Sequence, residues 1–459
     1  MFKLIILAIT AVCTLAVYAL PRETPPAGGE PKKFELPPRR TFTLDNGLSV
    51  TLVRFGSTPK VTLELVVAAG NIDEAADKVW LADLTGMLME EGTTGASSEQ
   101  IAEKLAGMGG QLDIRVGPDE TTISADVLSE FGPGALKVIA DVVRNPLLPE
   151  SELERLKTDL LRRSSIQQSR PQSQALEEFR KLLYGDHPYG RVFPTDEMLN
   201  SFALGDVKDF YGKNFGAGRA RLYVAGVFDQ DAVESAVREA FSGWDKGPAA
   251  VDNVPAPTSS RRVFLIDRPG AVQSTIYMGL PVIGPTADNW MELTVANYLL
   301  GGMFASRITT NIREDKGYTY SPRSTISVRR GDAYWVETAD VTSDVTAPAL
   351  KEIFHEIDRL QDEAPGEEEL RGVKNFTAGR FVLQNSSRGG IIGMLSYLDL
   401  HGLPVSYLEN YTANVMAITP LQIQQATKDY IRDQDMTVVV VGDKATIGKS
   451  LKEFGPVSE

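Results

Sequence analysis

The chain has 459 residues, of which 42% are hydrophobic and 24% are charged, so it is a folded protein too long for a single core. Its net charge of −14 argues against nucleic acid or an anionic membrane as the main partner, because both select clustered lysine and arginine. Its single cysteine, Cys13, excludes a disulfide within the chain.

The N-terminus has the pattern of a secretory signal. Lys3 precedes an apolar run that ends in small residues, which predicts cleavage after Ala19 and export to the periplasm or the extracellular space. An uncleaved anchor helix is the alternative, although the run is short for a membrane span. Residues 20–38 are rich in proline and polar residues and are expected to form a flexible lead-in.

Residues 39–244 are expected to form a first domain. It opens with a hairpin around Asn46-Gly47, because an Asn-Gly pair between alternating strands favours a tight turn. The later elements, in chain order, are a strand at 61–70, helices at about 77–91 and 98–107, a hairpin at 111–128, helices at about 133–144, 149–183 and 204–213, a strand at 219–226 and a helix at about 229–242.

A Pro- and Ala-rich stretch at 245–261 is the predicted linker, and the order of elements then restarts over 262–459. The second domain is predicted to have strands at 262–267 and 274–281, helices at about 287–300 and 303–315, a hairpin at 324–341, helices at about 346–361, 367–385 and 419–431, and a last strand at 436–443. Two homologous α+β domains follow, each a mostly antiparallel sheet with helices on one face.

The segment 301–322 carries the strongest candidate site. It predicts a helix that holds Arg313, a break at Gly317 and an extended stretch that holds Tyr320, a layout that can direct a guanidinium and a phenol at one carbonyl. The structural alternative is that Arg313 pairs with Glu314 or another acid and Tyr320 packs in a strand. Tyr318 is a competing phenol on the same strand face.

Four motifs carry a family resemblance: IREDKGYTYSP, TLDNGLSVTLV, YGDHPYGR and LADLTGMLMEEGTT. With them the chain resembles the pitrilysin/insulinase-type zinc metallopeptidases over nearly its whole mature length. It is similar to the non-catalytic subunits of bacterial two-subunit members and to mitochondrial-processing-peptidase-like proteins.

The resemblance implies that the zinc motif has degenerated. Active relatives carry H-x-x-E-H on the helix that matches residues 81–94, where the two histidines bind zinc and the glutamate activates water. Here those positions are Asp83, Gly86 and Met87, and the third ligand position falls near Arg162 or Arg163.

The sequence predicts no other metal site, because the three histidines lack ligand spacing and suit a loop, a helix surface and a helix end; they are His187, His355 and His401. No cofactor is therefore expected in this chain. The resemblance places zinc in a partner.

Three functions remain open. The first is an exported non-catalytic subunit, in which Arg313 and Tyr320 bind the carbonyl and oxyanion of a peptide substrate in trans, beside a partner subunit of the same family that bears H-x-x-E-H. The second is a pseudo-peptidase scaffold that binds peptides or proteins without hydrolysis. The third is an independent enzyme with an unfamiliar site, for which stoichiometric zinc together with peptidase activity would be the signature.

Overall fold

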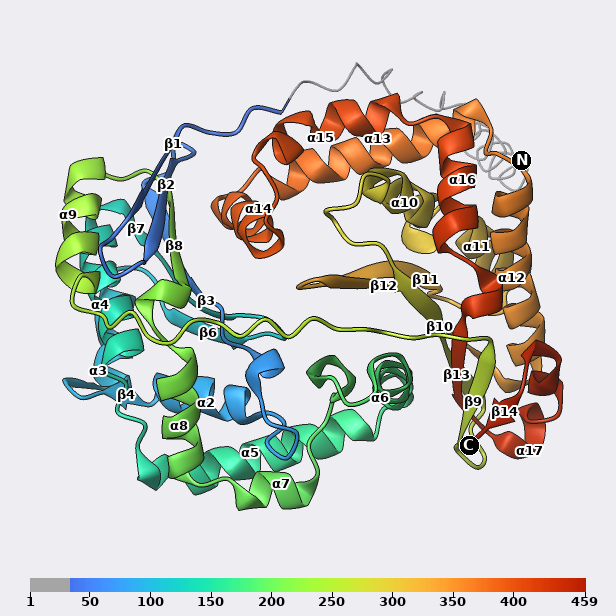
Figure 1. Cartoon of the computed structure of the whole chain (residues 1–459), viewed down its shortest axis with the longest axis horizontal. Helices are drawn as coiled ribbons and strands as arrows, with labels where there is room; N and C mark the ends of the chain where they lie inside the picture. Colours follow the sequence, from blue (N-terminus) through green and yellow to red (C-terminus); the bar gives the residue numbers. More distant parts are fainter. Residues whose placement is uncertain (1–33) are drawn as a thin grey trace, which may run out of the picture. The chain divides into compact units, whose positions relative to one another are not determined.

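Two six-stranded sheets organise the part of the chain that the structure describes, residues 34–459 of a computed structural model (Figure 1). The predicted signal at 1–19 and most of the lead-in at 20–38 lie outside the described residues. Among the helices of residues 34–459, none combines the length and the apolar character needed to cross a membrane.

The first sheet has the strand order β1-β2-β8-β3-β7-β6. Its strands are β1 (Arg39–Thr43), β2 (Ser49–Arg54), β3 (Lys60–Val67), β6 (Leu112–Val116), β7 (Thr121–Leu128) and β8 (Ala220–Gly226). Only β2 and β8 run parallel, and the other four pairs are antiparallel. A short separate hairpin joins β4 (Gly92–Thr93) and β5 (Ala96–Ser97).

The second sheet repeats this order. Its strands are β9 (Arg262–Asp267), β10 (Gln273–Val282), β11 (Arg323–Arg329), β12 (Asp332–Thr342), β13 (Thr437–Gly442) and β14 (Val457–Ser458). Its strand order is β14-β9-β13-β10-β12-β11. The pair β9 and β13 is parallel, like β2 and β8 in the first sheet. The three pairs that follow it are antiparallel, as they are in the first sheet. The sheets differ at one edge, where β14 pairs parallel to β9 but β1 pairs antiparallel to β2. The predicted α+β fold with two homologous, mostly antiparallel sheets is confirmed.

Helices of each half cover one face of that half's sheet. The first half has the 3-10 turns η1 (Asn71–Asp73), η2 (Ser129–Phe131), η3 (Pro188–Gly190) and η4 (Ala217–Arg219), with α2 (Leu81–Glu90), α3 (Ser98–Gly107), α4 (Gly132–Arg144), α5 (Glu150–Gln168), α6 (Pro171–Tyr184), α7 (Asp196–Ser201), α8 (Leu204–Asn214) and α9 (Gln230–Phe241). α2, α4, α8 and α9 share one apolar core with inward residues of β2, β3, β7 and β8.

The second half has α10 (Trp290–Asn297), the π-helical turn η5 (Tyr298–Gly302), α11 (Arg307–Thr309), the π-helical turn η6 (Thr310–Asp315), η7 (Ser343–Val345), α12 (Thr346–Asp362), α13 (Glu367–Gln384), α14 (Arg388–His401), α15 (Ser406–Ala417), α16 (Pro420–Tyr430), η8 (Asp433–Asp435), α17 (Lys444–Ile447) and η9 (Ser450–Phe454). α10, α12 and α16 pack with β9, β10, β12 and β13 in a second core.

The other face of each sheet is covered by the opposite half. α6 from the first half packs on β10 and β13, and its Phe179 contacts a core that includes Tyr334 and Val439. In return, α14 packs on β3 and β8, and its Ile392 shares a core with Val66 of the first sheet. The sequence prediction of helices on one face therefore describes each half only; in the whole chain both faces of both sheets are covered.

Polar contacts hold α6 and α14 on the sheets of the opposite halves. Arg388, at the start of α14, donates from Nη2 to the two carboxylate oxygens of Asp126 at 2.9 and 3.1 Å and from Nε to Thr62 Oγ1 at 3.0 Å. The hydroxyl of Tyr184 on α6 donates to Asp332 of β12. Because each contact joins residues of different halves, separating the halves would leave charged and polar groups unpaired.

One helix prediction was wrong and others needed revision. The helix expected over 149–183 is interrupted between α5 and α6, because Pro171 lacks the N–H that a continuing helix needs and suits the first helical position. α15 was not predicted, and the segment 290–315 contains two π-helical turns rather than plain helix. The segment 245–261 holds no helix or strand; the domain bounds at 39, 244 and 262 stay a prediction.

Candidate functional site

The helix α2 carries the positions of the degenerate zinc motif, and Glu74 fixes where it begins. The buried Glu74 carboxylate accepts the backbone N–H of Trp80 at 3.0 Å and that of Ala82 at 2.9 Å, which satisfies two donors at the helix start. The φ of Trp80 is +70°, a left-handed conformation that is uncommon for a bulky residue. Strong capping contacts therefore hold the entry to α2 in one conformation.

Asp83 on α2 and Arg163 on α5 form an ion pair. Arg163 Nη2 donates to Asp83 Oδ1 at 2.6 Å, and Asn71 Nδ2 donates to the other carboxylate oxygen at 3.0 Å. The guanidinium also packs over the Trp80 ring at 5.0 Å. Arg162, the other residue predicted for this place, is 71% exposed and pairs with Asp159. The structure thus brings Asp83 and Arg163 together and leaves Arg162 outside.

Burial raises the pKa of both carboxyl groups at the start of α2, Glu74 and Asp83. The pKa of Glu74 rises to about 8, although hydrogen bonds from Ala82, Asn71 and Trp80 act to lower it. Burial also raises the pKa of Asp83, while the hydrogen bond from Asn71 and the charge of Arg163 act in the opposite direction. Each carboxylate has donors from the protein, so the group is a satisfied structural network.

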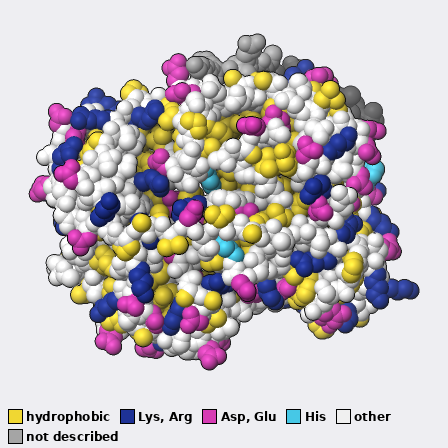
Figure 2. Space-filling model, in the orientation of Figure 1, with side chains coloured by type: hydrophobic (Ala, Val, Ile, Leu, Met, Phe, Trp, Pro, Cys, Tyr) yellow, Lys and Arg dark blue, Asp and Glu magenta, His cyan; other side chains and the backbone are white. Residues whose placement is uncertain are grey.

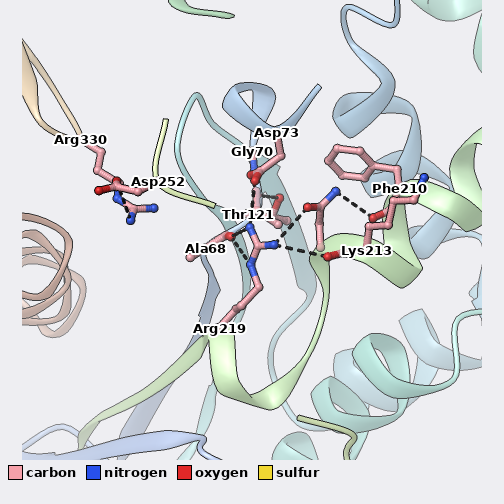
Figure 3. Close-up of polar contacts among 11 residues, drawn as sticks. Ala68, Gly70, Asp73, Thr121, Phe210, Lys213, Arg219, Asp252 and Arg330 are labelled. Atoms are coloured by element: carbon pink, nitrogen blue, oxygen red, sulfur yellow. Dashed lines mark hydrogen bonds and ion pairs between the residues drawn. The ribbon is translucent and has the colours of Figure 1, made fainter. Parts of the chain in front are cut away.

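A second network surrounds the buried Arg219 and holds η1, which packs against α2. Figure 3 shows its polar contacts. Arg219 Nη2 donates to Asp73 Oδ1 at 2.9 Å, and Asp73 Oδ2 accepts the backbone N–H of Gly70 at 3.0 Å. Asn71, which binds Asp83, lies within η1. The contacts of Arg219 therefore position the loop that in turn positions Asp83.

Arg313 and Tyr320 meet in the second half. Arg313 lies on η6, Gly317 has a φ of +66°, and Thr319 forms an isolated antiparallel bridge to Val341, so the predicted helix, break and extended stretch are present. The Arg313 Cζ lies 4.9 Å from the centroid of the Tyr320 ring, which is 80% exposed. The competing Tyr318 packs against the core instead.

The guanidinium of Arg313 has two further neighbours. Its Cζ lies over the Phe304 ring at 4.4 Å, and its Nε lies 3.1 Å from Glu314 Oε1. The structural alternative is present for Arg313, because it pairs with Glu314. Arg313 and Tyr320 are in contact, and their binding of a peptide carbonyl stays a prediction. The sequence analysis missed Phe304; its signal was one large aromatic residue among small ones, in Gly301-Gly302-Met303-Phe304-Ala305-Ser306.

The two groups of residues belong to different parts of the molecule. α2 packs on α5, α8 and β6, whereas η6 packs on α11 and α12. Leu84 of α2 lies in the first core and Ile312 of η6 in the second. The structure therefore assembles two separate local sites and does not join Asp83 to Arg313.

The histidines take the kinds of places that the sequence suggested. His187 accepts the backbone N–H of Tyr189 at 3.2 Å and caps η3, and His401 ends α14 before Gly402 at φ +65°. His355 lies within α12. Within residues 34–459, no group of three or more His, Cys, Asp or Glu side chains is placed to share a metal ion.

Two family models match the chain in succession. The model described as insulinase (peptidase family M16) matches residues 50–193, and the model described as peptidase M16 inactive domain matches residues 201–376. The chain belongs to the M16 peptidase family. This confirms the resemblance to the insulinase-type peptidases.

Relatives and solved structures agree with this family. An uncharacterized zinc protease of Rickettsia felis is 26% identical over 74% of this chain and 82% of its own length. One from Streptomyces coelicolor is 24% identical over 86% and 87%. A crystal structure of a peptidase M16 inactive domain from Pseudomonas fluorescens is 25% identical, covers 88% of this chain and 98% of its own, and has a TM-score of 0.82. A protease from Helicobacter pylori, 17% identical over 89% of this chain and 100% of its own, shares the fold with a TM-score of 0.82.

The zinc that the family implies does not fit the α2 site of this M16 chain. The Asp83 carboxylate is already paired with a guanidinium, whose positive charge repels a cation. Gly86 stands where the family has its glutamate, and a Cβ there would lie 2.8 Å from Val116 Cγ2. Met87 packs against the core. The motif positions are therefore filled by packing and by an ion pair, and no step of catalysis is assigned to them.

Proposed function

We propose that this chain is an exported, non-catalytic subunit of a heteromeric M16 peptidase, and that its Arg313 and Tyr320 complete an active site whose zinc is held by a partner chain. The observation that carries the proposal is that Arg313, whose side chain is 23% exposed, packs on two exposed rings, those of Phe304 and Tyr320. At α2, by contrast, Asp83 is paired with Arg163 of the same chain. The match to the M16 inactive domain supports a non-catalytic role.

The cluster supplies the donors that acyl chemistry requires. A peptide carbonyl becomes negatively charged at oxygen in the transition state, and pre-placed N–H and O–H donors stabilise that charge. The guanidinium of Arg313 and the hydroxyl of Tyr320 are such donors. The partner that fits carries H-x-x-E-H, lacks its own Arg/Tyr pair and supplies the metal-activated water.

The substrate class that fits is an extended peptide. β6 and β11 are edge strands of the two sheets, and an edge presents unpaired backbone N–H and C=O groups that a peptide can pair with. β11 begins at Arg323, three residues after Tyr320, so a peptide paired there would run close to the Arg313 cluster.

Reconstitution with the partner tests the proposal. The chain is co-purified with a candidate H-x-x-E-H subunit, and hydrolysis of a peptide library is compared for wild type, Arg313→Ala and Tyr320→Phe. Each substitution is expected to lower kcat by about 10²–10³ if it removes one oxyanion donor. If both variants give full rates, the role in trans is wrong.

The matched control for Arg313→Ala is Arg238→Ala. Arg238 also packs over an aromatic ring, that of Phe42 at 4.9 Å, and also pairs with a neighbouring glutamate, Glu234 at 2.8 Å. It lies on α9 in the first half, so its replacement should leave hydrolysis unchanged. An equal loss in both variants would indicate a general effect on folding.

A pseudo-peptidase scaffold is the second candidate, and Glu314 is the observation that favours it. A carboxylate 3.1 Å from Nε partly neutralises the guanidinium and weakens its hold on an oxyanion. If the purified chain binds peptides with unchanged affinity after Arg313→Ala, and no H-x-x-E-H partner gives hydrolysis with it, the scaffold function stands.

A further inference from the structure

The availability of donors on Arg313 limits which ligand it can bind. Nε faces Glu314, and the planar group packs on the rings of Phe304 and Tyr320. Within residues 34–459, neither Nη1 nor Nη2 makes a hydrogen bond, the ion pair with Glu314 is formed at Nε, and the Arg313 side chain is 23% exposed. The end-on edge of the guanidinium, with its two N–H donors side by side, is the part left for a ligand.

Two parallel N–H donors match two acceptor oxygens. A carboxylate accepts both in a bidentate, charge-assisted pair, which is roughly twice as strong as a neutral hydrogen bond. A peptide carbonyl offers one oxygen and no charge. The preferred ligand of this edge in the isolated chain is therefore a carboxylate, whereas Lys in place of Arg would keep the charge and lose the two-pronged geometry.

The two rings indicate which carboxylate fits. Phe304 is 67% exposed and Tyr320 is 80% exposed, so both retain free apolar surface beside the guanidinium. In a peptide C-terminus the carboxylate is attached directly to the Cα, which brings the last side chain within reach of these rings. The carboxylate of an internal Glu is separated from the backbone by a flexible stem and brings no second side chain with it.

Helix α13 of the second half also carries exposed apolar side chains. The Tyr298 ring contacts that of Phe376 on α13 at 5.5 Å, and a Cβ built on Gly302 would lie 3.1 Å from Tyr298. Leu383, on the same helix, is 73% exposed. Figure 2 shows hydrophobic side chains gathered over the region of α10, α13 and α14.

We propose that Arg313, packed on Phe304 and Tyr320, is a binding site for the C-terminal carboxylate of a peptide that ends in an apolar residue. The inference rests on the proposed function only in placing the peptide at this cluster. Because peptide hydrolysis creates a new C-terminal carboxylate, the cluster would also bind a product of that reaction. It requires neither the partner chain nor a metal.

Binding to the purified chain alone tests this proposal. The probes are dye-labelled alanine peptides: one with a free C-terminal phenylalanine, the same peptide as an amide, and an amidated peptide with an internal glutamate. Fluorescence anisotropy at low salt should give at least about tenfold tighter binding for the free acid than for either amide. Equal affinity of the free acid and the plain amide, or no binding of any probe at about 1 mM, would overturn the proposal, and tight binding of the glutamate probe alone would reassign the ligand.

Four variants sharpen the test. Arg313→Lys should remove most of the preference for the free acid, Phe304→Leu should weaken binding several-fold, and Arg238→Ala should change neither. Glu314→Gln should strengthen binding, because it removes a competing negative charge. Since hydrolysis is not measured, failure here leaves the role in trans untouched, and failure of reconstituted hydrolysis leaves this binding site untouched.

Discussion

The α2 site follows β3 along the chain and the Arg313 cluster follows β10, and these two strands hold the same position in their sheets. The polar groups of the two sites are nevertheless arranged differently. At α2, Glu74 is buried, Asp83 is 19% exposed, and both carboxylates have protein donors at 2.6–3.0 Å. At the other site, the guanidinium of Arg313 is packed on exposed rings and keeps two donors for solvent or a ligand.

This difference indicates where function is retained. A polar group whose partners all lie within the chain contributes to the fold, and replacing its partners has a cost in stability. A guanidinium whose outer N–H groups make no hydrogen bond within the described residues has donors left for a ligand. In the first half, the family's motif positions are occupied by structural contacts; in the second half, we propose that Arg313 has kept a role in recognition.

Restoring the family residue at position 86 is the most severe test of this contrast. Gly86→Glu places a side chain where even a Cβ would be 2.8 Å from Val116, and buries a charge beside the apolar Ile114. The free energy of unfolding should fall by about 2–4 kcal/mol. Denaturant unfolding measures it, and an unchanged midpoint would show that the space is still open.

Gly212→Ala is the control for that substitution. Gly212 lies on α8 with nothing within 4 Å of a built Cβ, so alanine should raise stability by about 0.5–1 kcal/mol through its higher helix propensity. Loss of stability in both variants would point to the glycine backbone, rather than to the closed α2 site, as the cause.

Breaking the ion pair at α2 should have a smaller effect. Arg163→Ala leaves the largely buried Asp83 without its charged partner and is expected to lower stability by about 1–3 kcal/mol, because Arg163 is itself 47% exposed. A double-mutant cycle with Asp83→Asn gives the coupling energy. Peptide binding at Arg313 should not change; a change there would contradict the separation of the two sites.

The smallest expected effect is a pH dependence from Glu120, which lies between the halves. Burial raises its pKa from 4.5 to about 7, against the charge of Arg221. The folded state therefore holds a proton that the unfolded state has released, so stability should fall as pH rises from about 5 to 8, by roughly 1–2 kcal/mol. Glu120→Gln should show a flatter profile than wild type, and a parallel profile would contradict the assignment.

The local elements could be predicted because their signals are local. Asn46-Gly47 marked the first hairpin. The helix expected at about 98–107 is α3, and Ser97 caps it, because its side chain accepts the N–H of Gln100 at 3.3 Å. The signal for the break before α6 was also present, as Pro171, but the prediction carried one helix across it. The chain's periodicity thus located most elements without fixing every boundary.

The packing of α6 and α14 on the sheets of the opposite halves was not predictable from periodicity. The second face of the first sheet mixes Val66 and Tyr223 with polar residues such as Thr62, a pattern equally typical of a face turned to solvent. At the candidate site, Arg313 and Tyr320 could be found from a motif. The packing of Arg313 on Phe304 depends on the path of the π-helical turns, which no local pattern encodes.

The mutual covering of the sheets also has a consequence for the order in which the chain can fold. Arg388 and Thr62 are 326 residues apart in sequence, so a core that closes the first sheet waits for the arrival of α14. Contacts of such separation carry a high loop-closure entropy and slow the search for the native state. Until α14 is available, β3 and β8 keep an uncovered apolar face, which makes the nascent first half a natural client for a chaperone.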